Sequence, residues 1–200
     1  VVAKLRGILQ MKKIGHTGTL DPDATGVLPV CIGKATKVCD LLTDKDKVYE
    51  AVIRFGVTTD TLDMTGTVTG EYPVAVTKEQ LVDTLAAFVG EIDQIPPMYS
   101  AIKINGKKLY ELARKGQEVE RKPRRVTIHE LILLEENLEQ KECTIRVHCS
   151  KGTYIRSLCS DIGKKLGCGA AMKELVRTRV GQFELAHAHT LSQIEDIVKN

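Results

Sequence analysis

The chain has 200 residues, of which 42 % are hydrophobic and 28 % are charged, as in ordinary globular proteins. A chain of this length buries roughly 70 % of its unfolded surface, so it forms a hydrophobic core without disulfides or a structural metal. No apolar run approaches the ~20 residues of a membrane helix, and the composition excludes disorder and low complexity. The net charge of +3 does not by itself identify or exclude a class of partner.

Hydrophobic periodicity and turn residues predict helices and strands in mixed order. Helical spacing or capping patterns predict helices over 1–11, 77–89, 109–115, 154–166, 170–175 and 192–199. Alternating or β-rich segments predict strands over 49–55, 99–104, 126–135, 142–149 and near 181–185. Glycines and prolines in 14–29 predict a loop. Because these elements do not follow a regular βαβ order, we predict an α+β fold.

Charge is distributed unevenly along the chain. Residues 103–125 carry nine basic and three acidic side chains, whereas residues 38–102 carry four basic and eleven acidic ones. A basic stretch beside an acidic one indicates a polyanionic partner, with a solvated loop as the alternative.

The six cysteines show no C-x-x-C pairing, so they do not indicate a zinc or thioredoxin-type site. No secretory leader is visible, and we expect buried thiols in a reducing, cytoplasmic compartment. The chain begins at Val1 inside a helical pattern, from which we expect a truncated or partial sequence.

The densest polar loop surrounds Asp21, which Leu20 and Pro22 hold in a stiff turn. From these residues alone, a structural Asx-turn is the more favoured role. The HTGTL segment is similar to the phosphorylation loop of aspartyl-phosphate ATPases, but Gly15 occupies the position of their nucleophile. No P-loop pattern occurs in the chain either.

A longer pattern extends from this loop. Residues 15–29 read GHTGTLDPDATGVLP, and further motifs follow in order at 47–49, 59–63, 96–103, 106–116, 150–156 and 167–170. Together they resemble the signatures of the TruB family of pseudouridine synthases. Because several long motifs recur in one order across nearly the whole chain, the resemblance is specific.

The resemblance implies that the protein isomerises a uridine in the TΨC loop of tRNA, at position 55, to pseudouridine. The base is flipped out, detached from C1′ with the help of an aspartate, and rejoined through C5. The implied fold has a mixed, largely antiparallel central sheet flanked by helices. We expect one catalytic domain over 1–200, with an RNA-gripping, thumb-like insertion at about 97–125. The family's N-terminal strand and C-terminal PUA domain are expected to be absent from this chain.

Three residues match the family's catalytic positions. Asp21 matches the catalytic aspartate, which adds to the substrate or stabilises positive charge at C1′. Arg156 matches the active-site arginine, which keeps that carboxylate ionised. Tyr49 matches the tyrosine that stacks on the flipped base. Without the resemblance, Arg156 would be assigned to a helix surface and Tyr49 to the core.

The other matched positions concern RNA binding. His16 matches the residue that fills the space left by the flipped uridine, and Leu175 an apolar residue above the site. Asp63 is expected either to pair with Arg156 or to cap a turn. Seven of the nine basic residues in 103–125 are candidate phosphate contacts: Lys103, Lys107, Lys108, Arg114, Arg121, Arg124 and Arg125.

We expect tRNA as the partner and a monomeric enzyme that needs no metal or cofactor and contacts no membrane. Two other classes remain open. A retaining glycosidase needs a second carboxyl ~5 Å from its nucleophile, and no motif suggests one. A non-catalytic RNA-binding module has no need for Asp21 together with Tyr49. The YSAxKxxGxxLYE pattern at 99–111 favours the stand-alone enzyme over the relative that works in box H/ACA guide complexes.

Overall fold

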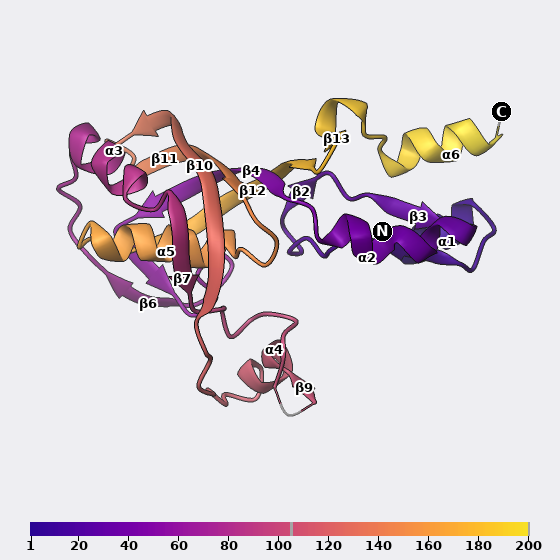
Figure 1. Ribbon diagram of the computed structural model, residues 1–200. Coiled ribbons are helices and arrows are strands. Elements are labelled where there is room, and N and C mark those ends of the chain that lie inside the picture. The colour runs from indigo at the N-terminus through magenta and orange to yellow at the C-terminus, as the bar shows by residue number, and fades with distance from the viewer. Residues whose placement is uncertain (105, 200) are drawn as a thin grey trace. The chain divides into compact units, whose positions relative to one another are not determined.

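The computed structural model describes residues 1–104 and 106–199, which divide into two compact units (Figure 1). The first unit comprises Val1–Tyr49 and Val176–Asn200, and the second comprises Glu50–Leu175. The strands β4 (Lys47–Phe55) and β12 (Ala170–Val180) contribute residues to both units. No helix in the described ranges has the length and apolar character needed to cross a membrane.

The second unit is built on antiparallel strands in the order β4-β11-β10-β7. Its elements beyond β4 and β12 are β5 (Val57–Thr59), β6 (Val68–Glu71), α3 (Lys78–Ala86), β7 (Gly90–Gln94), β8 (Lys103–Ile104), β9 (Lys107–Lys108), α4 (Leu109–Ala113), β10 (Arg124–Asn137), β11 (Glu142–Cys149) and α5 (Ile155–Lys165). Strict alternation puts every second residue of β11 inside, which confirms the hairpin predicted from the same alternation.

The core of the second unit lies where helix α5 covers the sheet (Figure 1). Fully buried side chains come from the sheet, such as Ile53, Ile128 and Ile145, and from the helix, such as Leu158 and Ile162. Helix α3 packs against both β10 and α5. Burial of each such aliphatic side chain contributes about 1.5–3 kcal/mol, which holds the start of α5 in place.

The first unit contains short elements around the polar loop of 15–29. They are α1 (Val2–Ile8), β1 (Ile14–His16), β2 (Thr25–Gly26), β3 (Val30–Ile32), the 3₁₀ helix η1 (Gly33–Val38), α2 (Cys39–Thr43), β13 (Phe183–Glu184), the 3₁₀ helix η2 (Leu185–His187) and α6 (Leu191–Lys199). Strands β1 and β3 pair antiparallel, while β2 runs parallel to β12. The first unit's strand order is β13-β12-β4.

One predicted helix is wrong. The segment 170–175 belongs to strand β12, although Ala, Met, Lys, Glu and Leu all favour helices. Ala170, Ala171 and Met172 are all buried, so the strand shows no alternation that would have revealed it. Tertiary pairing therefore overrides local propensity here. The mixed, largely antiparallel architecture with flanking helices confirms the predicted α+β class.

Candidate active site

Arg156 is a buried arginine in the first turn of α5, with 5 % of its surface exposed. Its Nη1 donates to the carbonyl oxygen of Thr61 at 3.0 Å, and its Nη2 donates to the carbonyl oxygen of Tyr99 at 2.9 Å. Because the guanidinium is planar, two bonds to separate loops fix its orientation as well as its position. The positive charge of Arg156 is therefore held in one place within the second unit.

Asp63 fulfils both roles that the sequence left open. Its Oδ2 lies 3.7 Å from Nη1 of Arg156, so the two side chains form an ion pair. Its Oδ1 caps a turn by accepting from Thr61 Oγ1 at 2.7 Å, from the Thr65 backbone N–H at 3.0 Å and from Thr65 Oγ1 at 2.6 Å. The backbone of this turn is in turn joined to Met172 of β12 by an isolated parallel bridge. The carboxylate is thus engaged on both oxygens.

Gln94 holds the start of helix α5, which carries Arg156. The sequence does not reveal this role. Its side chain is 1 % exposed. The amide Nε2 donates to the carbonyl oxygen of Tyr154 at 3.1 Å, and Oε1 accepts from the Tyr154 N–H at 2.9 Å. Ser157 Oγ adds a bond to the carbonyl oxygen of Ile95 at 2.9 Å. The start of α5 is therefore tied to the end of β7, and a lone glutamine at the end of a predicted strand gives no signal of this.

Asp21 lies in the first unit, half-buried in the loop that β1 and β3 close. The Thr17 N–H donates to the carbonyl oxygen of Pro29 at 3.1 Å, and the Ala24 N–H donates to that of Asp21 at 3.0 Å. These bonds make the loop a folded arch. The carboxylate is consequently carried on an ordered turn, as the stiff Leu20–Pro22 sequence predicts.

Gly26 shows how tightly the arch is held to β12. Its φ is +113°, which disfavours any residue with a side chain. A Cβ at this position would stand 2.2 Å from the carbonyl oxygen of Arg177. Only glycine therefore allows β2 to pair with β12 at this register.

The remaining residues matched from the resemblance differ in exposure. His16 is exposed at the end of β1, where its Nδ1 donates to the carbonyl oxygen of Gly18 at 3.1 Å. Tyr49 in β4 and Leu175 in β12 are both buried, each with 8 % exposed surface. An exposed imidazole is available to contact bases, whereas a buried tyrosine also satisfies the simpler interpretation as core.

The basic insertion is a small folded piece with its own core. Met98, Leu109 and Leu112 are buried together, and Tyr99, Ile102, Ile104, Ala113 and Val119 pack against them. The hairpin of β8 and β9 and the helix α4 lie beyond the ends of β7 and β10 (Figure 1). The first part of the insertion is therefore folded around apolar side chains.

The basic residues on this piece fall into two groups. Lys103, Lys107, Arg114 and Arg124 are exposed, and Lys108 is half-buried beside the ring of Tyr110. Arg121 and Arg125 instead have acidic partners, because Arg121 pairs with Glu118 and Arg125 forks onto Asp93 at 2.7 and 3.0 Å. Hydrogen bonding to Arg125 lowers the pKa of Asp93, so this pair is ionised at neutral pH. We therefore remove Arg121 and Arg125 from the candidate phosphate contacts.

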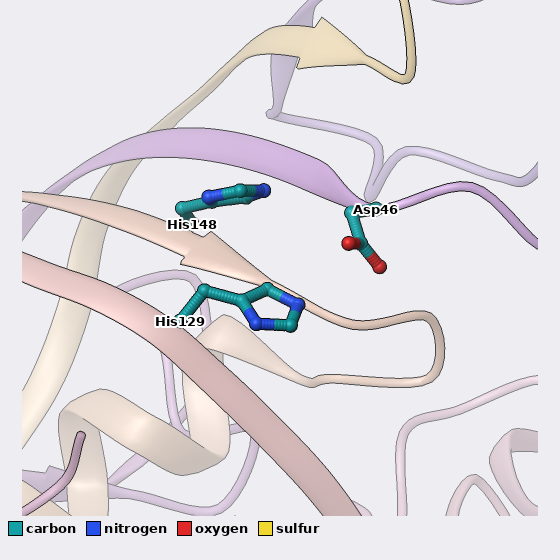
Figure 2. A group of neighbouring side chains, drawn as sticks. All are labelled: Asp46, His129 and His148. Atoms are coloured by element: carbon teal, nitrogen blue, oxygen red, sulfur yellow. The ribbon is translucent and has the colours of Figure 1, made fainter. Parts of the chain in front are cut away.

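Elsewhere in the second unit, His129 of β10 and His148 of β11 lie side by side (Figure 2). Their ring centroids are 4.8 Å apart, with a tilt of 51° between the planes. Burial raises the pKa of the Cys143 thiol to about 12 and raises that of Cys159 too, which keeps both protonated and poor as metal ligands.

The fold and the motif-bearing loops are those of a pseudouridine synthase. The model of the TruB family pseudouridylate synthase N-terminal domain matches residues 6–155, and that of the tRNA pseudouridylate synthase B C-terminal domain matches residues 156–200. The chain belongs to the TruB family, as the sequence motifs predict, and it is therefore an isomerase that acts on uridine in RNA.

Curated relatives agree with this assignment. The chain is 61 % identical to tRNA pseudouridine synthase B of Lachnoclostridium phytofermentans, matching all of this chain and 67 % of the relative. It is 48 % identical to the protein of the same name from Clostridium kluyveri, again over the whole chain and 69 % of the relative. The chain thus spans about two thirds of the length of these relatives.

Solved structures show the same fold. A crystal structure of a Cbf5–Nop10–Gar1 complex matches with a TM-score of 0.71 and 34 % identity, covering 92 % of this chain and 45 % of that one. An H/ACA ribonucleoprotein bound to a substrate RNA containing 2′-deoxyuridine matches with a TM-score of 0.72 and 31 % identity, covering 98 % and 47 %. The second of these neighbours holds RNA in its structure.

Proposed function

We propose that this protein converts the uridine at position 55 in the TΨC loop of tRNA to pseudouridine, as a cytoplasmic monomer. The observation that carries the proposal is the arch of 15–29, whose GHTGTLDPDATGVLP sequence matches the family signature and presents Asp21 on an ordered turn. The names of the relatives from L. phytofermentans and C. kluyveri support tRNA as the substrate.

In the proposed mechanism, the target uridine leaves its stack, which costs a few kcal/mol that RNA contacts offset. His16 occupies the vacated space, and Tyr49 stacks on the flipped uracil. Asp21 assists cleavage of the bond between N1 and C1′, either by covalent addition or by stabilising charge at C1′. The uracil then turns and bonds to C1′ through C5, and the proton on C5 is released.

Arg156 supplies a fixed positive charge to the reaction in this proposal. Its own geometry supports such a role, because a buried guanidinium held by two backbone carbonyls needs no reorganisation during the reaction. The engaged state of Asp63 argues against a glycosidase. A carboxylate that accepts three hydrogen bonds on one oxygen and faces an arginine with the other is unsuited to act as a general acid.

The experiment that tests the function is release of tritium from C5 of uridine in a labelled tRNA transcript. Isomerisation replaces the C5 hydrogen, so the amount of tritium released is proportional to the amount of uridine converted. A glycosidase instead frees uracil, and a non-catalytic binding module retains the label, so each alternative gives its own result.

RNA binding is expected to depend on salt chiefly through the basic insertion. Each neutralised phosphate contributes roughly −0.7 to −0.9 to the slope of log affinity against log salt. Replacing Lys107, Lys108 and Arg114 with alanine should therefore weaken tRNA binding and flatten that slope by up to about two units. Turnover at saturating tRNA should change less, because none of the three is proposed to contact the uracil. The measurement is tRNA affinity at several salt concentrations.

A triple alanine variant of Lys78, Lys164 and Lys165 removes the same charge from α3 and α5 and serves as the control. We expect its slope to match the unmodified protein. Equal affinities and parallel slopes for the Lys107, Lys108 and Arg114 variant would instead move the RNA-gripping role to the basic residues of 1–37.

Chelation is expected to leave turnover unchanged. The proposed chemistry uses one carboxylate, one arginine and one aromatic ring, and none of these needs a metal. The measurement is tritium release after exhaustive dialysis against a chelator. A reversible loss of activity that an added metal ion restores would contradict this mechanism.

A further inference from the structure

Arg177 is the largest of the fully buried side chains in the described part of the chain, with 1 % of its surface exposed. Its Nε donates to the carbonyl oxygen of Val27 at 2.8 Å. Its Nη2 is buried with no hydrogen-bond partner, and no carboxylate pairs with the guanidinium among the described residues. Burying an unpaired charge costs stability, and an apolar side chain of similar length fills the same space without that cost. Core packing therefore does not explain an arginine here.

The position of Arg177 relative to the arch offers an explanation. On one limb, its backbone pairs with Gly26, and its carbonyl oxygen accepts from the Val27 N–H at 2.7 Å. On the other limb, its Nη1 lies 3.9 Å from the point where a Cβ on Gly18 would stand. Asp21 lies between these two contacts in the chain. The guanidinium thus donates a hydrogen bond to one limb of the arch and lies close to the other limb.

A second group in this part of the first unit is also unsatisfied. Thr17 is fully buried, and its Oγ1 has no hydrogen-bond partner among the described residues. Buried polar groups are normally paired, so two such groups next to one loop mark a place where stability is not maximised. Such places are typical of functional sites.

We propose that Arg177 is a positioning residue for the isomerisation: it clamps both limbs of the arch and so sets the direction of the Asp21 carboxylate. The proposal rests on the function proposed above. Arg177 touches no substrate in it and acts only through the arch. A rigid, planar donor group suits this task, because it spans two backbone segments that a flexible or apolar side chain holds less firmly.

The test is Arg177→Met in the full chain, with an unmodified tRNA transcript as substrate. We expect kcat to fall about 100-fold, the loss that a misplacement of about 1 Å produces, while KM for tRNA changes less than about three-fold. The melting temperature should stay the same or rise, because an unpaired buried charge has been removed. A purely structural arginine gives the opposite pattern: a lower melting temperature and an unchanged kcat for the folded fraction.

Hydrogen exchange tests the clamp without any reaction. In Arg177→Met, amides of 15–29 should exchange at least about ten-fold faster, while those of β10 and β11 stay unchanged. If the unmodified protein forms no pseudouridine, the proposed function fails, but this measurement still shows whether Arg177 holds the arch. Unchanged exchange over 15–29 overturns the clamp.

Two further variants complete the experiment. Arg179→Met removes a half-buried arginine of the same strand β12, whose backbone pairs with Glu184 of β13, and it should leave kcat unchanged. Arg177→Lys keeps the charge but lacks the fork, so kcat should fall about ten-fold or more, which covers the case in which Arg177→Met does not fold. A normal kcat in folded Arg177→Met or Arg177→Lys overturns the proposal.

Discussion

Asp21→Asn is expected to abolish turnover while leaving tRNA affinity within about three-fold of the unmodified protein. The amide keeps the size and the turn of the aspartate but lacks the charge and the nucleophilic oxygen that the proposed cleavage at C1′ needs. An interaction used only in the chemical step lowers kcat without weakening binding. The measurements are tritium release under single-turnover conditions and tRNA affinity of the same preparation.

Asp23→Asn is the matched control for this variant. Asp23 is exposed in the same arch, two residues further along, and its replacement removes the same charge. We expect it to retain turnover near that of the unmodified protein. Retention of even a tenth of normal turnover in Asp21→Asn would refute the catalytic assignment, because such a small loss fits a change in local electrostatics.

The sequence predicts those elements of the fold whose signals are local. The Thr77–Gln80 capping box is present with both of its hydrogen bonds, and it starts α3 where expected. The alternation of β11 likewise survives in the fold, because one face of that strand is buried and the other is not. By contrast, β12 was predicted as a helix over 170–175. Its three consecutive buried residues are followed by exposed Lys173 and Glu174, and this order shows no alternation.

The candidate site shows the same difference between features with a local sequence signal and features without one. The side chains that we propose carry the chemistry, Asp21 and Arg156, were found because the motifs around them resemble a family. What holds Arg156 could not be predicted, because the Thr61 and Tyr99 carbonyl oxygens are backbone atoms that any residue supplies. The buried amide of Gln94 gives no pattern either, since its partner Tyr154 lies 60 positions away. Contacts between distant segments leave no trace in a single sequence.

In the insertion, the number of basic residues does not show which of them are paired with acidic side chains. Nine basic residues in 103–125 indicate an anionic partner, but counting charges treats them alike. The structure separates them, because Arg125 is neutralised by Asp93 of the neighbouring strand β7. A cross-strand ion pair depends on register, which the sequence does not specify here. The remaining exposed cations lie on a piece that Leu109 and Leu112 hold together.

Arg156→Met is expected to lower both stability and turnover. Among substitutions in the second unit, we expect this one to have the largest combined effect. Removing the guanidinium leaves the carbonyl oxygens of Thr61 and Tyr99 without their donor, and Asp63 loses its cation. Loss of one partner of a buried pair costs about 3–5 kcal/mol. Turnover should fall about 100-fold or more per folded molecule, because the fixed positive charge that Arg156 supplies to the proposed chemistry is lost. Denaturant unfolding and single-turnover tritium release measure the two effects.

A double-mutant cycle with Asp63→Asn separates the two parts of this prediction. Asp63→Asn keeps a group that still accepts hydrogen bonds at the turn but removes the charge facing Arg156, so its own effect on stability should be about 1–2 kcal/mol. Because Asp63 and Arg156 are in direct contact, the combined variant should lose less stability than the two single losses together, by about 0.5 kcal/mol or more. Strict additivity would show that the 3.7 Å approach carries no energy.

Arg156→Lys, which keeps the charge but cannot bond to both carbonyls at once, should recover part of the stability and less of the turnover. Full recovery of turnover in the lysine variant would mean that only the charge of Arg156 matters, and that its two-loop anchoring serves the fold alone.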